Sequence, residues 1–112
     1  MEKLFIHLYD IKKNHALYLT DKSLRLLRAY IDGYISGQIC EQGGITHYGQ
    51  PMRDFCRFIE KRYDFTESIP QGWCKIIEFY SSSDSAAFDT FFERLDEFLQ
   101  SRGCESEKLD TQ

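Results

Sequence analysis

The chain has 112 residues, of which 42% are apolar and 15% aromatic, and its net charge is −4. This length suits one domain with a single hydrophobic core, and the composition indicates a globular chain rather than a disordered one. The charge is uneven, because residues 1–83 hold 11 Lys/Arg and 10 Asp/Glu (+1), whereas residues 84–112 hold 3 and 8 (−5). Nucleic-acid binders usually show an excess of positive charge, so DNA and RNA are not expected partners.

Two short elements are predicted near the N-terminus. The apolar residues of segment 2–14 include Leu4, Ile6, Leu8 and Ile11. Their spacing fits either a strand or a short helix. A helix is favoured because Lys12 and Lys13 stand where a last helical turn prefers positive charge. Residues 16–20 are interpreted as a short extended connector, so a small extended segment or hairpin here is the main alternative.

A long helix is predicted over residues 22–41, with Thr20 or Asp21 as its N-cap. Apolar residues lie on two of its sides, which is typical of a helix at the centre of a domain. Gly33 and Gly37 are four residues apart and would let a second helix approach closely.

The rest of the chain reads as three further helices separated by loops. The helices are expected over residues 52–64, 73–80 and 85–101, with loops at 43–51, 65–72 and 81–84. Ser83 or Asp84 is placed to cap the last helix, and Gly103 to end it. The prediction is therefore an all-α fold, a single compact domain of about five helices over residues 1–102, followed by a solvated tail at 103–112.

The sequence contains no pattern that predicts a catalytic site or a metal site. Metal sites need paired ligands, and the one Cys–His pair close in sequence is Cys40 with His47. We expect no metal, no other cofactor and no catalytic activity. Without a signal peptide or a membrane-spanning run, a cytoplasmic protein with reduced thiols is expected. An enzyme that uses a Cys or His of the glycine-rich loop around His47 remains a third hypothesis.

The helix at 85–101 separates apolar residues from acidic ones. Its core face holds Phe88, Phe91, Phe92, Leu95, Phe98 and Leu99, and its acidic residues are Asp89, Glu93, Asp96 and Glu97. The like-charge pairs one turn apart, Asp89 with Glu93 and Glu93 with Glu97, each destabilise a helix slightly. The acidic face is therefore either a solvated back of the helix or a surface that meets a basic partner.

Two segments, "IKKNHALYLTDKSLRLLRAYIDGY" and "GWCKIIEFYSSSDSAAFDTFFERLDEFL", resemble a family of small bacterial proteins. These are often encoded beside polymorphic toxins of the Rhs or contact-dependent inhibition type and are regarded as their immunity proteins. The matching residues are Tyr18, Leu19, Ser23, Gly33, Tyr34, Gly72, Trp73, Ala87, Phe88, Asp89, Phe91 and Phe92. The resemblance implies a protein that neutralises a toxin by binding it, without catalytic residues.

The functional hypothesis is an immunity-type inhibitor whose acidic residues, Asp89, Glu93, Asp96 and Glu97, meet the basic site of a cognate toxin domain, for example a nuclease. Tyr48, in the glycine-rich loop, is the favoured aromatic anchor, with Tyr30 and Tyr63 as other candidates. The alternative is a small regulatory or adaptor module without a toxin partner. Exposed aromatic residues could also serve a homo-oligomer, although nothing indicates one.

Overall fold

The computed structural model describes residues 3–41, 50–65 and 72–103. It contains α1 (Lys3–Lys13), α2 (His15–Tyr18), α3 (Leu24–Glu41), α4 (Gln50–Arg62), α5 (Gly72–Phe79) and α6 (Asp84–Ser101). The described ranges contain no strand, and the prediction of a single all-α domain is confirmed. Residues 16–20, expected to be an extended connector, are so only in part: His15–Tyr18 form a short helix, whereas Leu19 is extended, with φ −127° and ψ 148°.

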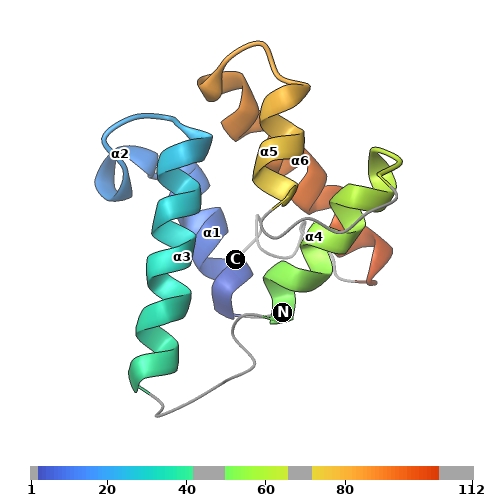
Figure 1. The fold of residues 1–112 in the computed structure, drawn as a ribbon. Helices are drawn as coiled ribbons and strands as arrows, with labels where there is room; N and C mark the ends of the chain where they lie inside the picture. Colours follow the sequence, from blue (N-terminus) through green and yellow to red (C-terminus); the bar gives the residue numbers. More distant parts are fainter. Residues whose placement is uncertain (1–2, 42–49, 66–71, 104–112) are drawn as a thin grey trace.

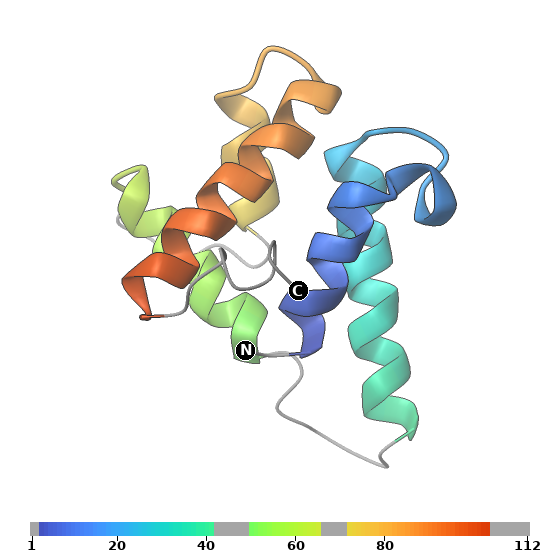
Figure 2. The same ribbon diagram turned by 180° about the vertical axis from the view of Figure 1, so that it is seen from behind.

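The helices form two groups that share one core. Figure 1 shows α1, α2 and α3 on one side of the molecule and α4, α5 and α6 on the other. Figure 2 shows from behind that α6 runs across α4 and α5, and α6 also packs against α3. Helix α6 therefore joins the two groups together with α3, which packs against both α5 and α6.

Aromatic side chains fill the centre of this core. Phe55 of α4 and Phe91 of α6 are fully buried, and their ring centroids lie 5.3 Å apart in an edge-to-face arrangement. Phe98 extends the cluster to the other group of helices, because it contacts Phe5 of α1 at 5.9 Å. The six residues predicted for the core face of α6 are all buried. Such aromatic pairs stabilise a fold beyond the area they bury.

The long helix α3 differs from its prediction in position and start. Its C-terminal half lies along one edge of the molecule (Figure 1). No described atom lies within 4 Å of a Cβ built at Gly33 or Gly37, so the predicted close approach of another helix there is wrong. The helix begins at Leu24, and its N-cap is Ser23, whose hydroxyl accepts a hydrogen bond from the Leu26 amide at 3.2 Å.

A second cap for α3 comes from α6. The Asp84 carboxylate accepts hydrogen bonds from the Ser23 hydroxyl and from the backbone amides of Leu24 and Arg25, at 3.1 and 3.3 Å for the two amides. The first turn of α6 has its own cap, because the Ser83 hydroxyl accepts from the Ala86 amide at 3.0 Å. Asp84 therefore stands at the N-termini of both α3 and α6. A negative charge at this position interacts favourably with the helix dipole, so Asp84 stabilises both helices.

The C-terminal ends of α6 and α5 differ in how well the sequence predicts them. Gly103 has a φ of 76° and follows α6, as predicted for a C-terminal glycine. Helix α5 ends at Phe79, and the Tyr80 side chain is 57% exposed rather than part of the core face.

Candidate partner-binding surface

The acidic face of α6, defined as Asp89, Glu93, Asp96 and Glu97, is held by other parts of the molecule. Asp89 forms an ion pair with Lys22, in the connection before α3, with 2.6 Å between the charged atoms. Asp96 accepts a hydrogen bond from the Tyr9 hydroxyl of α1. These contacts join residues that are 67 and 87 positions apart in the chain.

Glu97 makes the densest set of contacts on this face. One carboxylate oxygen lies 3.2 Å from Nε of Arg62 in α4, and the other lies 2.5 Å from Nη1 of Arg94 in α6. Three of the four acidic residues thus tie α6 to α1, to α4 and to the segment before α3. In the part of the chain that the structure describes, Glu93 is exposed and forms no ion pair or hydrogen bond through its carboxylate.

The aromatic anchors proposed from the sequence lie in different places. Tyr48, the favoured one, lies outside the described residues. Tyr30 packs beside His7, whose Nε2 lies 2.8 Å from the Tyr30 hydroxyl. Tyr63 follows α4 and its hydroxyl accepts a hydrogen bond from Nε of Arg94 at 3.0 Å.

An exposed aromatic surface adjoins Tyr63. The Phe79 side chain is 79% exposed and the Tyr80 side chain 57% exposed. The Tyr80 ring is stacked on Tyr63, with 5.0 Å between centroids, and meets Phe79 edge-to-face at 5.0 Å. We call Tyr63, Phe79 and Tyr80 the aromatic edge. Sequence reasoning missed it because the apolar spacing of α5 continues through Tyr80, and spacing alone does not show where the helix ends.

The aromatic edge and the acidic face form one connected network. Glu97 binds Arg94, Arg94 binds Tyr63, and Tyr63 stacks on Tyr80. The hydrogen bond to Tyr63, together with the negative charges of Glu97 and Glu93, holds the pKa of Arg94 above its ordinary value. The guanidinium therefore stays charged, and its planar group holds the Tyr63 ring in a fixed position.

The two described cysteines in α4 and α5 are poorly suited to nucleophilic catalysis. Burial raises the pKa of the Cys74 thiol to about 12, with a further contribution from its hydrogen bond to Glu78 at 3.2 Å. Burial also raises the pKa of Cys56. Both thiols are therefore protonated at neutral pH, whereas a cysteine nucleophile acts as the thiolate. Cys104 and His47 lie outside the described residues.

The described ranges contain no group of three or more His, Cys, Asp or Glu residues that could hold a metal ion. Within the same ranges, no helix is both long and apolar enough to cross a membrane. In comparisons with known proteins, no family model, no curated protein and no solved structure matches the chain.

Proposed function

We propose that this protein is an immunity-type inhibitor that acts in the cytoplasm by binding and blocking a cognate toxin domain. The observation that carries the proposal is the aromatic edge, where Phe79 and Tyr80 remain largely exposed and Tyr80 stacks on Tyr63, the residue that binds Arg94. Fully burying an apolar side chain of this size contributes about 1.5–3 kcal/mol, so an exposed pair is a strong potential anchor for a partner. Tyr, Phe and Arg are enriched in protein interfaces, and Tyr and Arg among their most important contacts.

The acidic residues that remain accessible support a basic partner. Glu93 is exposed, and the Asp89 side chain is 56% exposed although it pairs with Lys22. Residues 84–112 together carry a charge of −5. A nuclease toxin holds phosphate groups in a basic site, and opposite potentials accelerate association with such a site. In this proposal the aromatic edge supplies affinity, and the acidic residues mainly supply rate and orientation.

A titration with a defined partner tests the proposal. We expect the toxin domain encoded directly upstream to bind this protein at a single site in calorimetry. The double change Phe79→Ala/Tyr80→Ala should weaken binding by about 30-fold or more, because anchor residues contribute about 2 kcal/mol or more. The control is Leu17→Ala in α2, since Leu17 is 80% exposed but lies in the other group of helices.

The outcomes separate the two functional classes. Binding that is lost in the double variant and retained in Leu17→Ala would support an inhibitor that uses the aromatic edge. A charge reversal at Glu93 should slow association at low salt and leave dissociation nearly unchanged. Absence of binding to the upstream domain would favour the alternative of a regulatory or adaptor module.

A further inference from the structure

Helix α4 presents a row of positive charges. Arg53, Arg57 and Lys61 are spaced four residues apart, so they lie on one side of the helix, and all three are exposed. We call these three residues the basic face. Arg62, the next cation, is held by Glu97. By contrast, none of the three side chains of the basic face forms an ion pair or hydrogen bond with another described residue.

The stability of α4 accounts for only one member of this row, Lys61, which stands in the last turn, where the helix dipole favours a positive charge. Arg53 with Arg57, and Arg57 with Lys61, are like-charge pairs one turn apart, and each pair mildly destabilises the helix. Arg53 lies in the first half of the helix, where the dipole disfavours a positive charge. Asp54 is an acidic neighbour, but one of its oxygens accepts a hydrogen bond from the Gln50 side chain at 2.9 Å.

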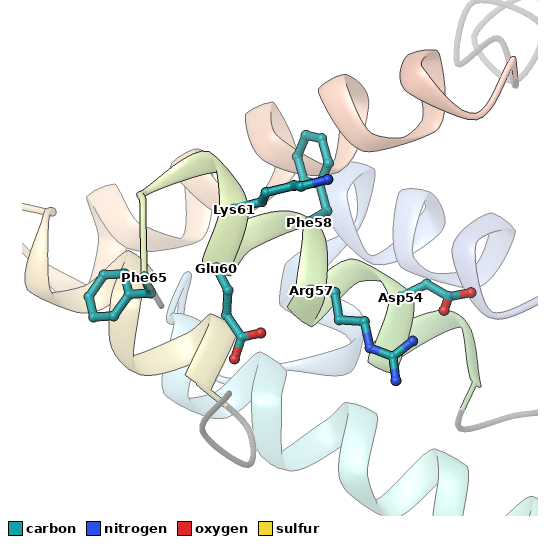
Figure 3. Close-up of a pocket in the computed structure, with 6 residues that line it drawn as sticks. All are labelled: Asp54, Arg57, Phe58, Glu60, Lys61 and Phe65. Atoms are coloured by element: carbon teal, nitrogen blue, oxygen red, sulfur yellow. The ribbon is translucent and has the colours of Figure 1, made fainter. Parts of the chain in front are cut away.

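An open hollow with an apolar part lies along the basic face. Its volume is about 460 Å³, and its lining side chains are Asp54, Arg57, Phe58, Glu60, Lys61 and Phe65. Figure 3 shows that five of them come from α4 and that Phe65 comes from the segment just after it. Phe65 is 39% exposed, and Phe58 is held in place by its contact with Phe98, at 5.4 Å between ring centroids. Cations and accessible aromatic carbon therefore occur at one site.

We propose that the basic face and this hollow bind an acidic segment of a protein, with an apolar side chain next to its carboxylates. Arg57 and Lys61 are separated by about 6 Å along the helix axis, which matches carboxylates placed about one turn or two extended residues apart. The apolar side chain would cover Phe65. This interaction does not depend on the proposed function, because it uses α4 instead of the aromatic edge and a partner surface of the opposite charge.

A nucleic acid fits the same surface less well. The whole chain has a net charge of −4, which repels a long polyanion. Nucleic-acid binders usually extend their positive charge along the backbone path, whereas three cations on one helix match only a short acidic segment.

The test uses a labelled peptide of four Glu-Glu-Leu repeats and the full-length protein, with fluorescence anisotropy as the readout. We expect saturable binding that weakens as salt is raised. The double reversal Arg57→Glu/Lys61→Glu should weaken binding by about tenfold or more, since two favourable charge contacts become repulsive. Phe65→Ala should weaken it several-fold by removing apolar contact area.

A charge-matched control and a rival ligand make the result decisive. Lys13→Glu/Lys75→Glu changes the net charge equally but alters exposed residues of α1 and α5, and it should leave peptide affinity nearly unchanged. Phe79→Ala/Tyr80→Ala should also leave it unchanged, which separates this site from the aromatic edge. Equal weakening in the charge-matched control, absence of peptide binding, or tighter binding of an oligothymidine would each overturn the proposal.

Discussion

The charged faces of α6 and α4 differ in how their charges are satisfied. On α6, Asp89, Asp96 and Glu97 bind residues of other parts of the chain. On α4, Arg53 and Arg57 form no such contacts with described residues. Both helices show the same pattern in the sequence, with like charges one turn apart. The difference teaches that a charged stripe in a sequence does not by itself indicate a free surface, because the fold can pair its charges.

The most sensitive test of α6 as a structural connector is Asp84→Ala. We expect a loss of about 2–3 kcal/mol in the free energy of unfolding, because the change removes the second cap of α3 and leaves the Ser23 hydroxyl and two amides without this acceptor. Urea unfolding followed by circular dichroism measures the effect. Ser82→Ala, an exposed position in the connection just before α6, is the control. A loss no larger than that of the control would contradict the role of Asp84 as a shared cap.

A smaller loss is expected for Glu97→Ala. Glu97 holds both Arg62 and Arg94, but its side chain is 39% exposed, so solvent screening limits the loss to about 1 kcal/mol. A double-mutant cycle with Arg62→Ala should give a coupling energy above about 0.5 kcal/mol. Additive effects would mean that the ion pair between α4 and α6 contributes nothing, and the contrast between the two faces would fail for this residue.

The smallest effect, with the opposite sign, is expected on α4. Arg53→Gln/Arg57→Gln should raise the free energy of unfolding by a few tenths of a kcal/mol, because it removes like-charge repulsion and breaks no described ion pair. Thermal unfolding at low and high salt measures this gain, which salt should reduce. A clear loss of stability would show that these cations have partners within the fold, and the basic face would no longer be a free surface.

The local part of the fold was predictable from the sequence. The core face of α6 follows from the spacing of Phe88, Phe91, Leu95 and its neighbours, and Ser83 was one of two candidates for its cap. These features depend on residues within one or two helical turns. The all-α class follows from the same kind of pattern, repeated along the chain.

The features that were missed depend on residues far apart in the chain. The hydrogen bond between Ser23 and Asp84 joins residues that are 61 positions apart in the chain. The hydrogen bond between Tyr9 and Asp96 joins residues that are 87 positions apart. No periodic pattern contains such pairs. For the same reason the sequence predicted the position of the acidic face but could not show which of its carboxylates are bound. The aromatic edge required the end of α5 to be known, which apolar spacing does not provide.

The position of Asp84 has a consequence for how the chain folds as it is made. During synthesis, α3 leaves the ribosome long before α6, so its first turn lacks the Asp84 cap until the last helix is available. Core residues such as Phe5 also stay uncovered, since Phe98 arrives late. We therefore expect the N-terminal helices to remain loosely structured until α6 docks, and the domain to complete its folding in one late, cooperative step.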